Sequence, residues 1–296
     1  MADKDSKIRA PGRRRAKEQE SEPQAIVAVA VCAASLRSLE QLFATLPADL
    51  GAAYLIAVRQ QDGLSVDTVV EALGRQTKMP VKVAKDGERL APDHILVGGS
   101  ESLLTLEDGH VRSAHTDQPV GHRGTVDTLL ISLAEHAQDR SVAIILAGLG
   151  SDGTAGVTAT KQYGGLSIAE AADGEAEAAD SGASTPAGVV DLLVPVADIP
   201  RHVALYVRNM AMVEGLDSQA SEDAITGQLT QIAAILRKAT GNDFHGYKRN
   251  TFMRRVQRRM QVVQVDEIGR YVERLRADRD EVQHLFQDLL IGVTQF

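Results

Sequence analysis

From residue 25 to about residue 210, short apolar runs alternate with longer stretches in which apolar residues recur at helical spacing. The apolar runs predict strands at 26–31, 53–58, 81–84, 94–97, 142–147, 166–169 and 189–194. The helical spacing is clearest at 35–46, 66–76, 125–138 and 155–163. Strands that alternate with helices predict an α/β fold, in which a doubly wound, mostly parallel sheet carries helices on both faces.

The same pattern divides the chain into four parts. Residues 1–24 are rich in charge and are predicted to be a disordered tail, residues 25–210 form the α/β domain, and the polar residues 211–224 form a linker. From residue 225 to residue 296 the apolar spacing is helical and no strand is evident, which predicts a small all-α domain.

Composition and charge narrow the classes of function. The 296 residues are 44% hydrophobic and 24% charged, as in ordinary soluble globular proteins. A single cysteine excludes an internal disulfide and a thiolate metal cluster, and we predict no metal site. A net charge of -8 and the absence of tryptophan argue against a nucleic-acid partner. The sequence contains neither a membrane-spanning apolar run nor a signal peptide, so we expect no membrane insertion and a cytoplasmic location.

Two polar segments come directly after predicted strands, at the positions where sheets of this kind bind ligands. Cys32 follows the strand at 26–31 and precedes a helix, a position that suits a nucleophile. The loop GLGSDG at 148–153 follows another strand and also opens a helix. If the two strands are neighbours, Cys32 and the loop share one cleft. The alternative for Cys32 is a small buried apolar residue.

The GLGSDG loop admits two interpretations. As a G-x-G-x-x-G sequence it would hold a nucleotide pyrophosphate on backbone N–H groups, with Glu170 at the distance expected of a ribose ligand. The match comes late in the chain, however, and Asp152 would place a carboxylate beside the phosphates. In the second interpretation Asp152 orients a histidine beside a nucleophile.

Several blocks of the chain resemble the catalytic domain of the chemotaxis protein-glutamate methylesterase, CheB. They are 26–47, 77–99, 122–135, 144–156 and 161–171, of which IILAGLGSDGTAG at 144–156 is the most specific. The resemblance implies hydrolysis of receptor glutamate methyl esters by a Ser-His-Asp triad. Carried over to this chain, the nucleophile falls on Cys32, the histidine on Arg59 and the acid on Asp152.

The residues at these positions predict an impaired triad. A cysteine can act as a nucleophile, but arginine stays protonated and cannot take up a proton. The glycines expected around the nucleophile have become Ala28, Ala30, Ala34 and Ser35, which crowd the backbone that would hold an oxyanion. We therefore expect an esterase-like domain that acts as a scaffold or regulator and uses no cofactor. The alternative is an active methylesterase in which Cys32 is the nucleophile. A further hypothesis joins Arg59 and Asp152 in a structural ion pair.

A basic face is predicted on a helix in the second domain. Helical spacing over 251–260 puts four arginines together, namely Arg254, Arg255, Arg258 and Arg259. Helix-turn-helix spacing is lacking, and such a face suits an acidic protein segment better than DNA. Residues 244–260 and 268–296 resemble the N-terminal helical domain of the chemotaxis protein-glutamate methyltransferase, CheR. The resemblance implies recognition of a methyl-accepting chemoreceptor or another acidic helical segment, and hence a role in chemosensory adaptation.

The same resemblance implies a contact to S-adenosylmethionine near the end of the chain. Thr294 and Phe296 match the family pattern, whereas Gly292 replaces its asparagine. A glycine-rich S-adenosylmethionine loop is absent after residue 225. We therefore expect the chain to be a fragment of a methylesterase–methyltransferase fusion, with S-adenosylmethionine bound only in a longer parent protein.

Overall fold

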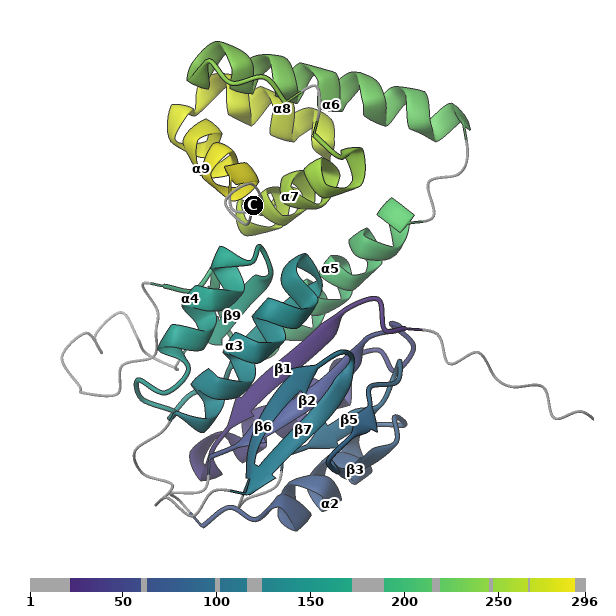
Figure 1. The fold of residues 1–296 in the computed structure, drawn as a ribbon, viewed down its shortest axis with the longest axis vertical. Coiled ribbons are helices and arrows are strands. Elements are labelled where there is room, and N and C mark those ends of the chain that lie inside the picture. The colour runs from purple at the N-terminus through teal and green to yellow at the C-terminus, as the bar shows by residue number, and fades with distance from the viewer. Residues whose placement is uncertain are drawn as a thin grey trace, which may run out of the picture.

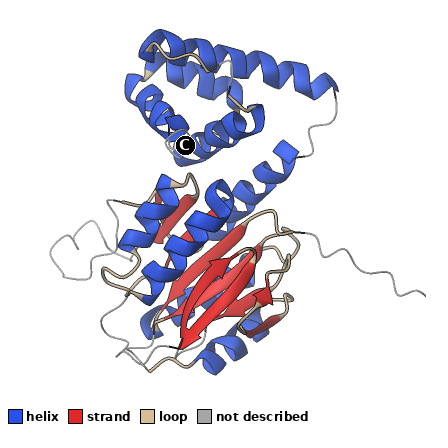
Figure 2. Cartoon of the chain, in the orientation of Figure 1, coloured by secondary structure: helices blue, strands red, loops and turns tan. Residues whose placement is uncertain are grey.

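The fold is taken from a computed structural model. It describes residues 22–59, 63–98, 102–115, 124–171, 189–214, 219–244, 247–265 and 267–290. Within these ranges, Figure 2 shows one body of strands and helices and a second body built of helices.

The first body contains a seven-stranded sheet in which all the described strand pairs are parallel. In spatial order its strands are β10 (Leu192–Val194), β9 (Leu166–Glu170), β8 (Ser141–Ile145), β1 (Ile26–Val31), β2 (Ala53–Val58), β5 (Ile95–Val97) and β3 (Val81–Val83). The seven predicted strands are therefore present, with ends that differ by up to three residues.

Helices cover both faces of this sheet because its central strands are apolar on both sides. Along β1, Val27, Val29 and Val31 belong to one core cluster, and the alternate residues belong to another. The first cluster includes residues of α1 (Leu36–Thr45), α2 (Val66–Gln76) and α5 (Ile199–Glu214). The second includes residues of α3 (Thr125–Ala137) and α4 (Thr154–Gln162). The predicted doubly wound α/β fold is confirmed.

A second, three-stranded sheet was not predicted. It is antiparallel, in the order β4 (Glu88–Arg89), β7 (His110–His115), β6 (Ser102–Glu107). The turn between β6 and β7 is Asp108-Gly109, and both residues have positive φ, 48° and 74°. That backbone favours a two-residue hairpin.

The second body is helical, as predicted. It consists of α6 (Gln219–Thr240), α7 (Arg249–Val262), α8 (Ile268–Ala277) and α9 (Arg279–Leu290), packed around an apolar core of their own. Gly241 ends α6 with a φ of 76°, where a residue without a side chain is favoured.

Helix extends from both sides into the predicted linker 211–224, because α5 continues to Glu214 and α6 begins at Gln219. Most of the predicted tail 1–24 lies outside the described residues. At its end, Gln24 already donates a backbone hydrogen bond to Gly51 (2.9 Å). Among the described helices, none is long and apolar enough to cross a membrane.

Candidate functional site

Three adjacent strands bring the predicted site residues to one edge of the sheet. β1 lies between β2 and β8. Cys32 follows β1, Arg59 follows β2, and the 148–153 loop with Asp152 follows β8. Because the strands are parallel, their carboxyl ends meet at the same edge. Cys32 and the loop are therefore neighbours, as the sequence led us to expect.

Cys32 is fully buried beneath this loop. Its Sγ donates to the carbonyl oxygen of Ala147 (3.6 Å) and lies 3.4 Å from Ser35 Oγ. Ser35 Oγ also accepts the backbone N–H of Cys32 (3.1 Å). A Cβ added to Gly148 would lie 3.0 Å from Cys32 Sγ, so this glycine closes over the thiol. An ester carbonyl can reach the sulfur only if the loop moves.

Arg59 holds the same loop from the other side. Its Nη1 donates to the carbonyl oxygen of Leu149 (2.7 Å), and its Nη2 donates to that of Gly148 (3.1 Å). The guanidinium is thus fixed to the backbone that covers Cys32. At the position that the resemblance assigns to the family's histidine, it supplies positive charge and hydrogen-bond donors, but no proton acceptor.

Asp152 accepts a hydrogen bond at the amino end of α3. Its Oδ1 accepts the backbone N–H of Asp127 in the first turn of α3 (3.3 Å). Asp127 Oδ1 in turn accepts the backbone N–H of Gly156 in the first turn of α4 (2.8 Å). Asp152, which lies just before α4, therefore satisfies an N–H group at the start of α3. Asp127 of α3 satisfies one at the start of α4. The sequence reasoning missed Asp127, although an acidic residue in the first turn of a helix is the usual signal of such a role.

Burial raises the pKa of Asp152 above its ordinary value of 3.8, and the charge of Asp127 raises it further. The backbone hydrogen bonds from Asp127 and Val126 oppose this increase, and the charge of Arg59 opposes it less. Desolvation therefore outweighs the attraction of Arg59. This balance does not favour the hypothesis that an Arg59–Asp152 ion pair dominates at this position.

The geometry also bears on the nucleotide interpretation of the loop. Its glycines Gly148, Gly150 and Gly153 all have positive φ, so the turn itself explains them. Two of its carbonyl oxygens point at Arg59, whereas a phosphate site requires N–H groups. Glu170 is buried and accepts hydrogen bonds from Ser38 Oγ (2.6 Å) and the backbone N–H of Ala147 (2.9 Å). Glu170 therefore supports the loop, and it is not placed as a free ribose ligand.

Among the described side chains, no histidine is hydrogen-bonded to Cys32 or Asp152. His94 bonds with the carbonyl oxygen of Pro92, and His136 accepts the backbone N–H of Gly109. Nor do the described residues form a cluster of three or more potential metal ligands.

The comparisons with known proteins agree with this geometry. The model of the CheB methylesterase family matches residues 27–203. The chain belongs to the CheB methylesterase family. The crystal structure of the Thermotoga maritima CheB methylesterase catalytic domain aligns with a TM-score of 0.53 and 25% identity, over 61% of this chain and 97% of that domain. The model of the CheR methyltransferase all-alpha domain matches residues 227–290. Both resemblances noted in the sequence are confirmed.

Two curated relatives show how much of a longer protein the chain represents. A protein-glutamate methylesterase/protein-glutamine glutaminase of Geobacillus kaustophilus is 36% identical over 181 residues, 60% of this chain and 52% of that protein. An uncharacterized 104.1 kDa protein of Rhodobacter capsulatus is 31% identical over 244 residues, 76% of this chain and 26% of that protein. The chain thus spans about half or less of the length of these relatives.

In the CheR-like helical domain, the four predicted partner-binding arginines do not form an open face. Arg259 pairs with Glu281 of α9 through two hydrogen bonds of 2.6 and 3.0 Å. Arg254, Arg255 and Arg258 point at the CheB-like domain of the same chain. Arg254 lies 3.4 Å from a carboxylate oxygen of Asp139, and Arg255 donates to the carbonyl oxygen of Tyr163 (3.4 Å). The structure therefore differs from the expected exposed face, and docking of a separate acidic partner there stays a prediction.

Arg258 is the centre of this domain seam, by which we mean the contact of α7 with the CheB-like domain. Its side chain is 2% exposed. It donates to Asp191 (2.8 Å) and the carbonyl oxygen of Gly165 (2.8 Å) in the CheB-like domain, and it also pairs with Asp288 of α9. Burial lowers the pKa of Arg258, but the two aspartates outweigh burial and leave that pKa above its ordinary value. The guanidinium is therefore charged and paired on both sides of the seam.

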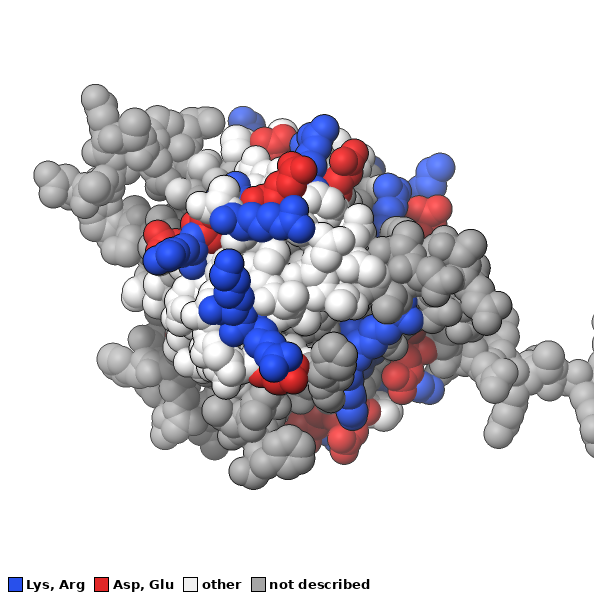
Figure 3. Space-filling view, turned by 90° about the horizontal axis from the view of Figure 1, so that it is seen from above, with Lys and Arg blue, Asp and Glu red and all other residues white. Residues whose placement is uncertain are grey.

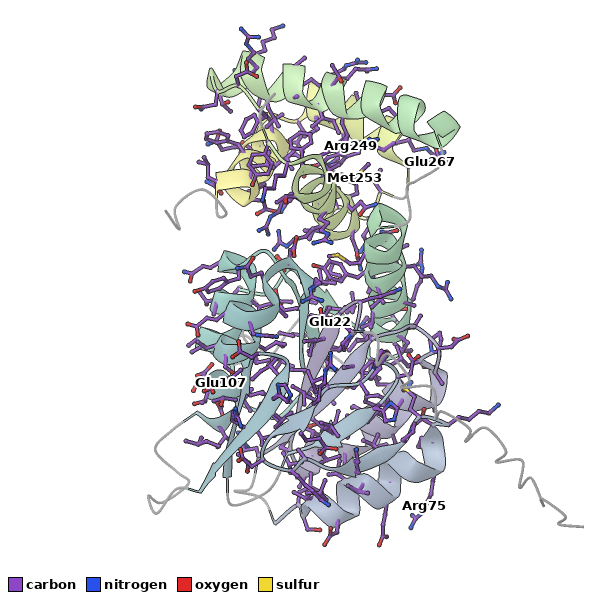
Figure 4. The ribbon with its side chains drawn as sticks, turned by 45° about the vertical axis from the view of Figure 1, so that its right-hand side comes forward. Glu22, Arg75, Glu107, Arg249, Met253 and Glu267 are labelled. Atoms are coloured by element: carbon purple, nitrogen blue, oxygen red, sulfur yellow. The ribbon has the colours of Figure 1, made fainter. Side chains whose placement is uncertain are left out.

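A glycine makes room for the seam. The guanidinium of Arg255 occupies the space that a side chain at Gly164 would need, since an added Cβ would lie 0.9 Å from Arg255 Nη1. Gly164 also has a φ of 83°. In Figure 4, α7, which carries the labelled Arg249 and Met253, lies on the side of the helical domain that faces the CheB-like domain.

The seam and the candidate site lie at opposite edges of the large sheet. Asp139, Gly165 and Asp191 come just before β8, β9 and β10, at the amino ends of the strands. Cys32 lies at the carboxyl ends, so the helical domain leaves the candidate site uncovered (Figure 1).

On the face of the helical domain shown in Figure 3, Lys and Arg lie among Asp and Glu. Thr294, the expected S-adenosylmethionine contact, lies outside the described residues.

The thiol of Cys32 should react slowly in the folded chain. Because it is buried under Gly148, a thiol reagent such as DTNB must wait for the loop or the domain to open. We expect a reaction at least about 100-fold slower than in guanidinium chloride. The chain has one cysteine, so absorbance reports on this residue alone. A peptide with the same flanking residues calibrates the exposed rate, and a folded chain that reacts at that rate would contradict burial.

The Asp152→Asn substitution should change stability in a pH-dependent way. The raised pKa of Asp152 means that the folded chain binds the proton more tightly than the unfolded chain, so ionisation costs stability as pH rises. Asparagine does not ionise. The free energy of unfolding of Asp152→Asn, minus that of the wild type, should therefore increase between about pH 4 and pH 7. Urea unfolding at several pH values measures it. A decrease would mean that pairing with Arg59 dominates after all.

The Arg258→Met substitution should destabilise the chain by about 3 kcal/mol, because it removes the buried guanidinium from Asp288 and leaves Asp191 with Lys161 alone (3.6 Å). Urea unfolding followed by circular dichroism measures the loss. Arg270→Met is the matched control, since the Arg270 side chain is 76% exposed and pairs with Glu267, which is exposed as well. The control should change stability by less than about 0.5 kcal/mol. Equal effects of the two substitutions would show that the seam contributes nothing specific.

Proposed function

We propose that this chain is a chemosensory adaptation protein whose CheB-like domain does not hydrolyse esters and acts instead as a scaffold or regulator. The observation that carries the proposal is the position of Arg59. Its guanidinium replaces the general base and is fixed to the loop that covers Cys32. A permanently charged group cannot take the proton of a nucleophile or return it to a leaving group.

The surrounding contacts support the same conclusion. Loss of one triad member leaves only the catalysis that substrate binding and the oxyanion hole provide. In this chain the thiol is buried, and Gly148 lies against both Cys32 and Ala34, where the oxyanion would have to enter. Asp152 is engaged at the start of α3 and is not oriented toward a base.

The chemosensory setting rests on the two family matches, which combine a methylesterase domain with the helical domain of the opposing methyltransferase. Within this proposal the partner is a methyl-accepting chemoreceptor or a similar acidic helical segment. The CheB-like domain needs no cofactor, and S-adenosylmethionine binding belongs to a longer parent protein.

The chain should release no methanol from a methylated receptor fragment beyond the amount released by Cys32→Ala. The Thermotoga maritima CheB catalytic domain serves as the positive control, and we expect it to be faster by at least about 1000-fold. Methanol release is measured by coupled oxidation. Binding of the fragment to the Cys32→Ala chain, measured by calorimetry, tests the scaffold role directly.

Release by the wild-type chain above the Cys32→Ala background would overturn the proposal, because Cys32 would then be a nucleophile. A combined Cys32→Ser and Arg59→His variant separates the two causes of inactivity. Activity in this variant would assign the loss to the two side chains alone, whereas silence would assign it also to the closed loop over the site.

A further inference from the structure

A groove on the CheB-like domain lies between the end of α1 and one flank of α5. Its volume is about 540 Å³. Its walls are Thr45, Pro47, Ala197, Pro200, Arg201, Ala204, Leu205 and Arg208. We call it the α1–α5 groove. Cys32 precedes α1, whereas the groove adjoins the last residues of that helix, so it is separate from the candidate esterase site.

The floor of the groove is apolar and its rim is cationic. Pro200 and Ala204 are buried, Leu205 is half-buried, and Arg201 and Arg208 are exposed. The wall contains no Asp or Glu; Asp198 is near in sequence but is not part of it. The two arginines are separated by seven residues, or about 10 Å along the helix axis. They therefore flank the same side of α5.

These arginines differ from those of α7 in their contacts. Among the residues that the structure describes, the side chains of Arg201 and Arg208 have neither a hydrogen bond nor an ion pair. Arg258 and Arg259, by contrast, are paired with carboxylates inside the fold. Positive charge available to a partner is thus present on α5, beside an apolar floor.

We propose that the α1–α5 groove binds an acidic amphipathic helix of a partner protein. Apolar side chains of that helix would cover Pro47, Pro200 and Leu205, and its carboxylates would pair with Arg201 and Arg208. An apolar face flanked by acidic residues two turns apart matches this combination of floor and rim.

The number and spacing of the charges favour this occupant over other anions. Nucleic-acid binding uses many phosphate contacts, and the chain as a whole has a net charge of -8. Anionic membranes attract clusters of about four to eight basic residues, and the groove wall has two. A single phosphate ion would leave the apolar floor exposed to water.

The opposite flank of α5 takes part in the domain seam. The carbonyl oxygen of His202 accepts a hydrogen bond from Gln261 of α7 (2.6 Å). Within the CheB-like domain, Tyr206 donates its hydroxyl to the carbonyl oxygen of Asp139 (2.6 Å), whose carboxylate contacts Arg254 of α7. A helix bound in the groove would therefore rest on the same element that carries the helical domain. The inference goes beyond the proposed function, and its readout is peptide binding and not ester hydrolysis, so either can fail alone.

The test uses the full chain and a fluorescein-labelled 18-residue peptide. The peptide has leucine at positions i, i+3, i+4 and i+7 of each repeat and glutamate on both flanks. Fluorescence anisotropy gives the Kd at low and at physiological salt. We expect binding that weakens with salt, and a Kd that rises at least about tenfold in the variant Arg201→Glu/Arg208→Glu.

The matched control is Arg75→Glu/Arg270→Glu, which changes the net charge equally at two exposed sites outside the groove. Figure 4 labels Arg75, at the end of α2. The control should bind as the wild type does, and circular dichroism checks that both variants are folded. A scrambled peptide of the same composition should bind at least about tenfold more weakly.

Three results would overturn the inference. They are equal binding of the scrambled peptide, equal loss of binding in the groove variant and the control variant, and tighter arginine-dependent binding to phosphatidylserine vesicles or to inorganic phosphate than to the peptide. The last result would assign the groove to a membrane surface or a small anion.

Discussion

A buried guanidinium is stable only beside opposite charges, and the two aspartates that pair with Arg258 belong to different domains. Asp288 comes from the helical domain, whereas Asp191 and the carbonyl oxygen of Gly165 come from the CheB-like domain. Burying this charge is favourable only when all its partners are in place. The ion pair therefore requires one arrangement of the two domains. That arrangement puts the helical domain at the amino ends of the strands, at the edge of the sheet opposite to Cys32.

At the carboxyl edge of the sheet, the three residues that the resemblance assigns to the triad all contact the 148–153 loop or lie in it. Cys32 contributes a small buried side chain under Gly148, Arg59 fixes the covering loop, and Asp152 satisfies the start of α3. Each residue is now engaged in a contact that stabilises the closed loop. A nucleophile, a base and an orienting acid would instead need access, a free acceptor and a histidine, respectively. The backbone thus follows the fold of the CheB catalytic domain, while these side chains hold the loop over Cys32.

The features predicted from sequence were those that depend on local pattern or on a general rule. Apolar runs located the strands of the large sheet, and the rule for parallel strands placed Cys32 beside the loop of Asp152. The hairpin of β6 and β7 also has a local signal, Asp108-Gly109 between alternating apolar residues. The predicted linker is polar in composition, but polar composition does not exclude helix, and α5 and α6 extend into it.

The domain seam had no local signal at all. A row of arginines at helical spacing looks the same whether it faces water, a partner or another part of the chain. The position of the acidic partners decides which of these the arginines face. Asp139 lies 115 residues from Arg254 in the sequence, and Asp191 lies 67 residues from Arg258. The space that the Arg255 guanidinium occupies exists because residue 164 is a glycine, which has no side chain.

Because the arginines of α7 contact groups inside the fold, a row of arginines in the sequence is a poor guide to where this protein can bind an acidic partner. Among the described residues, the side chains of Arg201 and Arg208 on α5 have no partner, and the proposal above assigns that capacity to them. α5 thus contacts α7 through His202 and presents these two arginines on another flank.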